Sequence, residues 1–301
     1  MRVLVTGASG LVGSNVAAAA AQQSWEVLDA RAELTDRKAC VGLAANWEPD
    51  VIVHAAGECS FGRFESDPYA AQREYLGAEH TLAAARHVRA RYVLVSSDQV
   101  YSGRLPLGWR AGERDLPDPV NAHGRAKLAC EEAVMRSAVR WLVVRPGEVY
   151  GVNATTPQRL GLTLRLVARL QRRALLPAPA GGVRSPIYAR DFSQRLCELI
   201  AQGCEGVYNV AGPVALGRLA WAQLLAREFG CRQELVRAGS DDAFMRACGE
   251  REGVRLAANA GLNDEKTTAA IGAPAIAPER GLALTRQTLT QTRVPVGCSA
   301  R

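Results

Sequence analysis

A glycine-punctuated turn directly after an apolar strand constrains the fold of this chain more than any other stretch. Residues 2–13 read RVLVTGASGLVG, with Gly7, Gly10 and Gly13 at three-residue spacing before a predicted helix over 12–23. Glycine permits unusual backbone angles and close approach of other groups. The free N–H groups at the helix start, together with the helix dipole, favour a phosphate. The stretch therefore predicts a dinucleotide or similar phosphate ligand.

Strand-like and helix-like segments alternate through the first half of the chain. The predicted strands cover residues 2–6, 26–28, 51–55, 91–96 and 141–145. The predicted helices cover residues 12–23, 37–46, 68–87 and 122–138. Near-continuous apolar strands separated by helices predict a parallel sheet covered on both faces, with ligands at the carboxyl ends of its strands. The expected fold class is therefore α/β, with a doubly wound parallel sheet.

The pattern changes after residue 150, where the predicted elements are smaller. Helices are predicted over 159–173, 191–202 and 219–229, a strand over 207–210, and a Pro/Gly-rich loop over 177–186. We therefore expect a nucleotide-binding domain over residues 1–150 and a smaller substrate-binding region over 151–292 packed on it. Residues 293–301 are expected to form a frayed tail.

Charge and cysteine content narrow the class of protein. The chain has 301 residues, with 37 Lys and Arg against 30 Asp and Glu, a net charge of +7. The cations are scattered, which favours a small anionic ligand over nucleic acid. Because Met1 and Arg2 lead directly into the first predicted strand, we expect no signal peptide. No apolar stretch reaches membrane-spanning length. The eight cysteines form no C-x-x-C pair, so we expect reduced thiols, no metal site and a cytoplasmic location.

Two later segments contain side chains suited to chemistry. Residues 94–103 read LVSSDQVYSG at the end of the fourth predicted strand, where a serine can reach a ligand in the crevice. The same composition is equally typical of a turn stabilised by side chains. Residues 119–127 read PVNAHGRAK and open a helix, on which His123 and Lys127 are four apart and share one face.

Taken together, these segments resemble an extended short-chain dehydrogenase/reductase of the dTDP-4-dehydrorhamnose reductase and NAD-dependent epimerase/dehydratase type. The matching segments occur in the family's order: TGASGLVG at 6–13, PDVIVHAAG at 49–57, ESDP at 65–68, SSDQVYSG at 96–103, HGRAKLACE at 123–131, RPGEVYG at 145–151 and SPIYARD at 185–191. Residues 213–290 resemble the family's C-terminal part more loosely. The resemblance implies a Rossmann-type domain that binds NADP(H) or NAD(H).

The resemblance also implies which residues contact the cofactor. Those expected along the pyrophosphate are Gly7, Gly10, Leu11, Val12 and Gly13. The other expected contacts are Asp29, Arg31, Glu33, Leu34, Ala55, Ala56, Gly57, Lys127 and Pro146. Asp29 is placed at the adenine ribose, and the nearby Arg31 is able to receive a 2′-phosphate. The choice between NAD and NADP stays open, with a lean to NADP.

By the same resemblance, the expected catalytic residues are Ser97, His123 and Lys127. Ser97 would bind the substrate carbonyl, and Lys127 would bind the nicotinamide ribose and lower the pKa of its neighbour. The expected substrate contacts are Ser97, Asp98, Glu148 and Arg184, with Glu148 at a position usually held by an aromatic residue. Arg184 and Arg190 would either meet a nucleotide diphosphate or face solvent. Asp191 is expected to cap the helix that follows it.

Departures from the family pattern fall at chemically central positions. His123 stands where the family has its catalytic tyrosine, and Tyr75, within one residue, where it has an asparagine; Gln99 replaces another aromatic residue. A phenol titrates near pH 10, whereas imidazole starts near 6.5 and an adjacent ammonium lowers its pKa further. A neutral His123 suits a general base better than an acid. Tyr75 and Tyr101 are candidates to replace the missing tyrosine.

Three functions are consistent with these residues. The first is a NAD(P)(H)-dependent oxidoreductase that reduces a keto group of a nucleotide-linked sugar or similar metabolite. The second is an epimerase or dehydratase that uses His123 as a base. The third is a NAD(P)-binding regulatory or scaffold protein without catalysis. The resemblance also suggests a homodimer formed through the helices predicted over 68–87 and 122–138.

Overall fold

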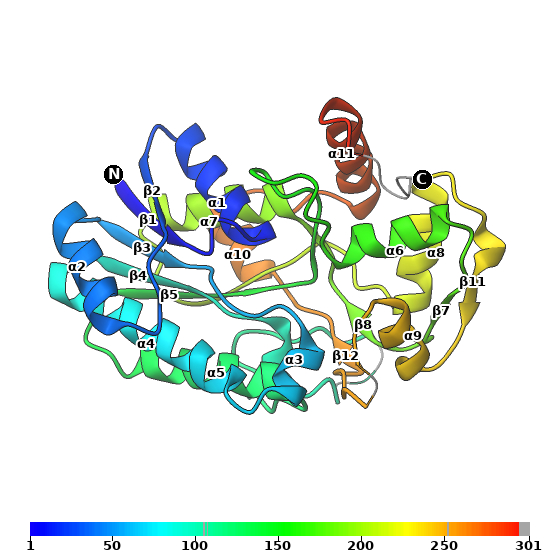
Figure 1. The fold of residues 1–301 in the computed structure, drawn as a ribbon, viewed down its shortest axis with the longest axis horizontal. Helices are drawn as coiled ribbons and strands as arrows, with labels where there is room; N and C mark the ends of the chain where they lie inside the picture. The colour runs from blue at the N-terminus through cyan, green and yellow to red at the C-terminus, as the bar shows by residue number, and fades with distance from the viewer. Residues whose placement is uncertain (105, 107, 252, 295–301) are drawn as a thin grey trace.

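The computed structural model describes residues 1–104, 106, 108–251 and 253–294, and a six-stranded parallel sheet forms its centre (Figure 1). The strands are β1 (Arg2–Thr6), β2 (Glu26–Ala30), β3 (Val51–His54), β4 (Arg91–Val95), β5 (Trp141–Pro146) and β10 (Gly206–Val210). Their order is β10-β5-β4-β3-β1-β2. Because the order reverses between β1 and β3, a crevice is expected outside their carboxyl ends. The predicted α/β class is confirmed, and the strand bounds agree with the prediction within two residues.

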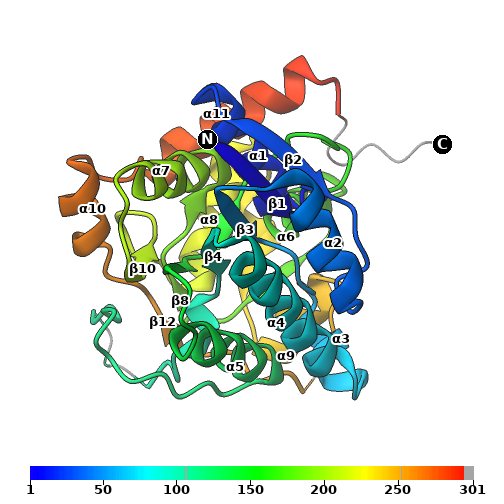
Figure 2. The ribbon, with the colours of Figure 1, turned by 90° about the vertical axis from the view of Figure 1, so that its left-hand side faces the viewer.

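Helices cover both faces of this sheet (Figure 2). On one face, α1 (Leu11–Gln22) and α7 (Ala189–Ala201) pack against one another and against the side chains of Val3, Val53 and Val144. On the other face lie α2 (Arg37–Trp47), α4 (Ala70–Val88) and α5 (Ala122–Met135). Because both faces are covered, the middle of strands such as β1 and β3 is apolar on both sides.

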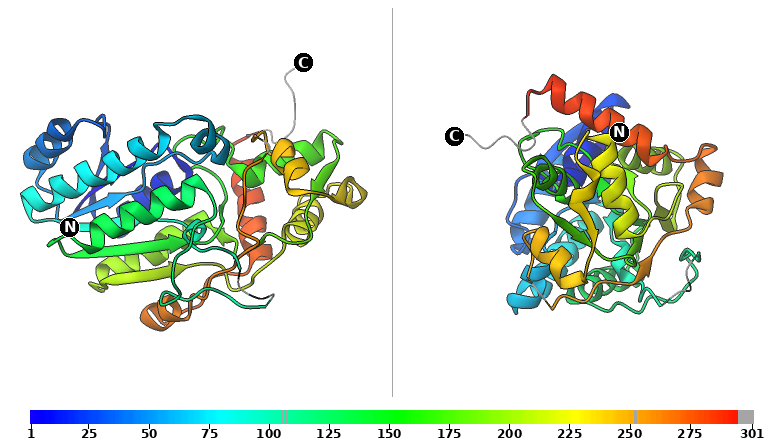
Figure 3. Two further views of the ribbon diagram at one scale, coloured as in Figure 1. Left: turned by 90° about the horizontal axis from the view of Figure 1, so that it is seen from below. Right: turned by 90° about the vertical axis from the view of Figure 1, so that its right-hand side faces the viewer.

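A second group of elements has its own core, and Figure 3 shows it at the opposite end of the molecule from α2. It contains α6 (Leu162–Gln171), α8 (Arg218–Glu228), α9 (Asp241–Ala247), α11 (Pro278–Gln291), β7 (Leu176–Ala178) and β11 (Val236–Ala238). Between α6 and α8 the chain returns to the central sheet. There β10 pairs with β5, and α7 packs beside α1. The predicted domain division at residue 150 stays a prediction. The structure adds that residues after 150 also contribute to the first group, through α7 and β10.

Short elements connect the two groups. They are α3 (Phe61–Ser66), the single-turn helices η1 (Asp98–Val100) and η2 (Gln233–Leu235), β6 (Val149–Tyr150) paired with β9 (Ile187–Tyr188), β8 (Val183–Arg184) paired with β12 (Asn259–Ala260), and α10 (Glu265–Ile271). The predicted loop over 177–186 thus contains most of β7 and all of β8. These strands are too short for a pattern in the sequence to reveal them.

The prediction that Asp191 caps its helix is wrong. Because β9 leads directly into α7, the helix begins at Ala189 and Tyr188 is its N-cap, without a side-chain hydrogen bond. The Asp191 carboxylate instead accepts a hydrogen bond from the backbone N–H of Ile276 at 2.8 Å. Asp191 therefore has a structural role, but it fixes the segment before α11 rather than the start of α7.

Within the described ranges, no helix is long and apolar enough to cross a membrane. The same residues contain no group of three or more His, Cys, Asp and Glu side chains arranged to hold a metal ion. Of the predicted frayed tail, residues 295–301, including Cys298, lie outside the described part of the chain.

Candidate functional site

The glycine turn joins β1 to α1 and leaves the start of the helix open. Gly7 has a φ of +70°, and the N–H of Gly10 donates to its carbonyl at 2.8 Å. A Cβ added to Gly13 would lie 2.3 Å from the Gly7 oxygen, so only glycine permits this approach. Gly10 caps α1 without a side-chain hydrogen bond, and the first helical turn contains no acidic residue. The free N–H groups and the helix dipole fit the pyrophosphate of a dinucleotide.

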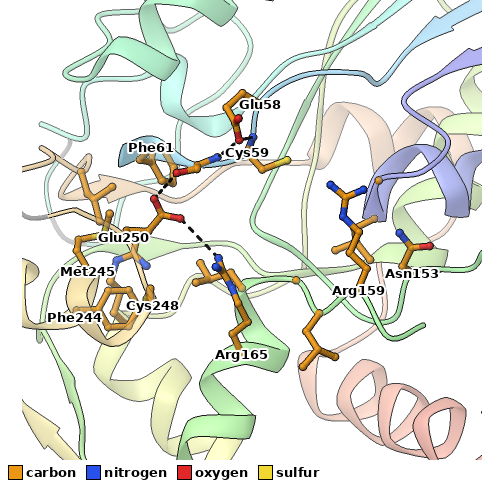
Figure 4. Close-up of a pocket in the computed structure, with 18 residues that line it drawn as sticks. Glu58, Cys59, Phe61, Asn153, Arg159, Arg165, Phe244, Met245, Cys248 and Glu250 are labelled. Atoms are coloured by element: carbon orange, nitrogen blue, oxygen red, sulfur yellow. Dashed lines mark hydrogen bonds and ion pairs between the residues drawn. The ribbon is translucent and has the colours of Figure 1, made fainter. Parts of the chain in front are cut away.

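Two hollows lie along this edge of the sheet. The first, of about 310 Å³, extends from Gly10 and Leu11 to Phe244 in α9. Figure 4 shows Asn153 and Arg159 on one side of it and Phe244 and Met245 on the other. The second, of about 480 Å³, is lined by predicted cofactor residues including Glu33, Leu34, Ala56 and Gly57. Both hollows include Glu58, so they form a continuous edge.

The remaining predicted cofactor residues lie along the same edge. Asp29 in β2 is paired with Arg31 at 3.1 Å, and the Arg31 side chain is 88% exposed. Pro146 ends β5 and Ala55 follows β3. The structure thus brings these residues to one edge of the sheet. Their contacts with a cofactor stay predictions.

Ser97 lies at the end of β4, as predicted. Its hydroxyl accepts a hydrogen bond from the N–H of Gln99 at 3.1 Å and donates to Asp98 at 3.3 Å. Asn121 caps α5 and donates to the Gln99 side chain at 3.1 Å. A Cβ on Gly124 would lie 2.1 Å from the Gln99 carbonyl oxygen. This tight packing holds the start of α5, with His123, against the turn that follows Ser97.

The imidazole of His123 is enclosed by aromatic rings. The side chains of Phe61 and Phe64 meet it edge-on, with ring centroids 5.2 and 5.0 Å away. Its Nδ1 atom is buried and has no hydrogen-bond partner among the residues that the structure describes. Burial and the charge of Lys127 lower the pKa of His123 to about 4, although Glu74 acts in the opposite direction. The imidazole is therefore neutral at pH 7.

We expect this low pKa to make the fold acid-sensitive. As the pH falls from 7 to 5, the unfolded chain gains a proton on His123 near pH 6.5 while the folded chain does not, so the free energy of unfolding falls by about 2 kcal/mol. His123→Phe should lose this part of the pH dependence, measured by urea unfolding at both pH values. His87→Gln, at an exposed position, is the control. An identical pH dependence in wild type and His123→Phe would contradict the buried neutral imidazole.

Lys127 is paired with a residue that the sequence did not single out. Its ammonium lies 2.6 Å from the Glu74 carboxylate, with side-chain exposures of 9% and 3%, and it donates to the Val95 carbonyl at 3.4 Å. Burial alone would lower the pKa of Lys127, but the charge and hydrogen bond of Glu74 raise it above its usual value. The ammonium stays charged, and its charge is balanced within the site.

The structure brings Glu74, and not the neighbouring Tyr75, to Lys127. Tyr75 is 39% exposed, whereas Glu74 points inward to Lys127. The helical repeat could have indicated this, because Glu74 shares its face with Ala78 and Thr81, which are both buried.

Neither tyrosine proposed from the sequence takes the place of the missing phenol. Tyr75 faces outward from α4. The Tyr101 hydroxyl donates to the Gly112 carbonyl at 2.8 Å and accepts from Arg145 at 2.7 Å. Arg145 is in turn paired at 2.6 Å with Glu131, which also accepts a hydrogen bond from Ser96. Tyr101 therefore belongs to a buried structural network.

The predicted substrate residues are brought together in buried pairs. Asp98 lies 3.4 Å from Arg184, which is 3% exposed and so does not face solvent, whereas Arg190 is exposed. Glu148 lies 3.9 Å from Arg218, whose guanidinium covers the Phe244 ring at 4.7 Å. Within the described part of the chain, the buried polar atoms without a hydrogen bond include Asp98 Oδ2, Glu148 Oε1, Arg184 Nη2 and Arg218 Nε. Such atoms favour a polar ligand or water nearby.

The sequence is similar to those of several known proteins. The family model described as RmlD substrate binding domain matches residues 1–284. The dTDP-4-dehydrorhamnose reductase of Mycobacterium tuberculosis is 28% identical over 254 residues, or 81% of each chain. Methionine adenosyltransferase 2 subunit beta of Rattus norvegicus is 34% identical over 161 residues, which cover 50% of this chain and 47% of that protein. The chain thus spans about half the length of this second relative.

Solved structures show the same fold. The crystal structure of a dTDP-4-dehydrorhamnose reductase from Clostridium acetobutylicum has a TM-score of 0.82 at 19% identity, and covers 96% of this chain and 100% of its own. The Bacillus anthracis dTDP-4-dehydrorhamnose reductase, solved in complex with NADP, has a TM-score of 0.80 at 19% identity, and covers 95% and 98%.

Proposed function

The chain belongs to the RmlD substrate binding domain family, and on this basis we propose that it is a NAD(P)(H)-dependent oxidoreductase acting on a keto group of a nucleotide-linked sugar or similar metabolite. The observation that carries the proposal is the convergence of three features at one edge of the sheet. They are the open glycine turn, the strand-end Ser97 and the helix that presents His123 and Lys127. The reductases among the relatives support it.

The family resemblance suggests a role for each of these residues. The free N–H groups after Gly10 would bind the pyrophosphate, Ser97 would orient the substrate oxygen, and Lys127 would hold the ribose beside the nicotinamide. A bound reduced nicotinamide would supply the hydride. The exposed Arg31 can exchange its pairing with Asp29 for a 2′-phosphate. This favours NADP(H) over NAD(H).

The state of His123 limits the direction of proton transfer. With a pKa of about 4, about one imidazole in a thousand carries a proton at pH 7. Reduction of a carbonyl needs a proton donor, whereas oxidation of a hydroxyl, epimerisation or dehydration needs a base. We therefore propose that reduction is slow at neutral pH and accelerates toward acid, with His123 acting directly or through water.

A second candidate function is a NAD(P)-binding regulatory protein without turnover. Two observations favour it, since His123 is buried among phenylalanine rings and Glu74 neutralises Lys127. The relative whose name marks it as a subunit of methionine adenosyltransferase also supports this alternative.

Turnover assays of the wild type, His123→Phe and His123→Tyr distinguish an oxidoreductase from a regulatory protein. The protein is mixed with NADPH or NADH and a panel of nucleotide 4-keto sugars, and loss of nicotinamide absorbance is followed between pH 5 and 8. For an oxidoreductase, we expect His123→Phe to lose about 100-fold in rate, as for removal of a general acid or base. We expect His123→Tyr to be faster at pH 7.

Nucleotide binding without turnover would support the regulatory protein. In that case wild type and His123→Phe bind the nucleotide equally and are both inert on every substrate. Thermal unfolding of each variant provides the control for folding.

A further inference from the structure

We propose that Glu74 is a cofactor-binding residue, whose carboxylate accepts hydrogen bonds from the ribose hydroxyls beside the nicotinamide while Lys127 donates to the same ribose. The inference rests on the proposed function, because that function places the ribose at Lys127. It assigns a role to a buried ion pair that the proposed chemistry does not otherwise need.

The position of Glu74 is the first argument. Its side chain lines the hollow that contains Ala56 and Gly57, although only 6% of the residue is exposed. A Cβ added to Gly57 would lie 2.6 Å from the Oε1 atom of Glu74, so the carboxylate lies directly against this strand-end glycine. The carboxylate is therefore part of the edge along which the dinucleotide is proposed to bind.

The hydrogen-bonding capacity of Glu74 is the second argument. Its Oε2 accepts one hydrogen bond, from the Glu58 N–H at 3.1 Å, and its Oε1 lies 2.6 Å from the Lys127 ammonium. A carboxylate has about four acceptor sites, so capacity remains beyond these two contacts. The ion pair offsets part of the cost of burying these two groups.

The chemistry of the pair identifies the part of the ligand that it fits. An ammonium can only donate hydrogen bonds and a carboxylate can only accept them, whereas a hydroxyl does both. Neighbouring ribose hydroxyls can therefore donate hydrogen bonds to Glu74 and accept them from Lys127. Acidic residues accept hydrogen bonds from ribose hydroxyls in the same way in other dinucleotide-binding folds. A phosphate beside Glu74 would instead be repelled. The pair thus fits the uncharged riboside and not the pyrophosphate.

Titrations with the whole cofactor and with a fragment test this role. We expect Glu74→Gln to weaken NADPH binding by about 10- to 100-fold, the effect of losing a hydrogen bond to a charged group. Binding of 2′,5′-ADP, which lacks the nicotinamide riboside, should change by less than about two-fold. Glu79→Gln, on the same helix but 34% exposed, is the matched control and should bind both ligands as wild type does.

Two further measurements keep the test decisive if Glu74→Gln folds poorly. Glu74→Asp keeps the charge beside Lys127 but withdraws the carboxylate, and should also weaken NADPH binding selectively. The wild-type protein should bind less tightly a dinucleotide that lacks the 2′-hydroxyl of the nicotinamide ribose.

Unchanged NADPH affinity in Glu74→Gln or Glu74→Asp overturns the inference and leaves the proposed function intact. Tighter NADPH binding by Glu74→Gln also overturns it, because Glu74 would then compete with the ribose for Lys127. If the wild type binds neither NADPH nor NADH, the proposed function fails and this inference fails with it.

Discussion

Glu131→Gln is expected to lower the free energy of unfolding by about 3–5 kcal/mol, the cost of removing one partner of a buried ion pair. The Glu131 side chain has no exposed surface, and its carboxylate accepts three hydrogen bonds from the Arg145 guanidinium, at 2.6, 2.9 and 3.2 Å. Burial alone would lower the pKa of Arg145, but the hydrogen bonds and charge of Glu131 raise it. The substitution thus leaves a buried guanidinium without its counter-charge.

Equilibrium unfolding in urea measures this loss, and the next residue provides the control. Glu132 pairs with Arg136 on the exposed surface of the same helix, with side-chain exposures of 52% and 73%. Glu132→Gln should therefore change stability by less than about 0.5 kcal/mol. A loss below about 1 kcal/mol for Glu131→Gln would show that the network is not the structural element described above.

Gly13→Ala is expected to reduce both stability and cofactor affinity. The added Cβ would lie 2.3 Å from the Gly7 oxygen and 2.9 Å from the Ala8 nitrogen, and these backbone atoms can move only if the turn opens. We expect about 1–3 kcal/mol of destabilisation, as for other overpacked sites. The displaced helix start should lose at least two hydrogen bonds to the pyrophosphate, which corresponds to at least about 100-fold in affinity for NADPH.

Gly42→Ala is the matched control for this substitution. Gly42 lies within α2, and a Cβ there would meet no atom within 4 Å. Alanine should therefore stabilise the protein by about 0.5–1 kcal/mol and leave NADPH binding unchanged. Calorimetric titration and urea unfolding of both variants provide the comparison. Equal NADPH affinity in Gly13→Ala and Gly42→Ala would place the pyrophosphate elsewhere.

The sequence predicted the central sheet well because its strands are apolar on both faces. Strand β4, for example, is buried along its whole length, so its limits follow from composition alone. The start of α7 was not predictable in this way, since β9 runs into the helix without a capping side chain. Short elements such as α9 contain too few residues for a periodic signal.

Some residues of the candidate site could be predicted from the sequence, and others could not. The glycine turn, Ser97 and Lys127 were predicted from local spacing and from a family resemblance. Glu74 and Arg218 were missed because their roles arise from tertiary contacts, between α4 and α5 for Glu74 and between α8 and the segment after β5 for Arg218. The helical repeat indicates that Glu74 faces inward, but no pattern of neighbouring residues shows which side chain it meets there.

Direct titration of the wild-type protein with NADPH and NADH tests the central claim most simply. The change in nicotinamide fluorescence reports binding without any need for a substrate or for turnover. We predict saturable binding at one site per chain, tighter for NADPH than for NADH, and retained in His123→Phe. Absence of saturable binding of both nucleotides to the folded wild-type protein would contradict the claim that the edge of the sheet from Gly7 to Lys127 is a dinucleotide site.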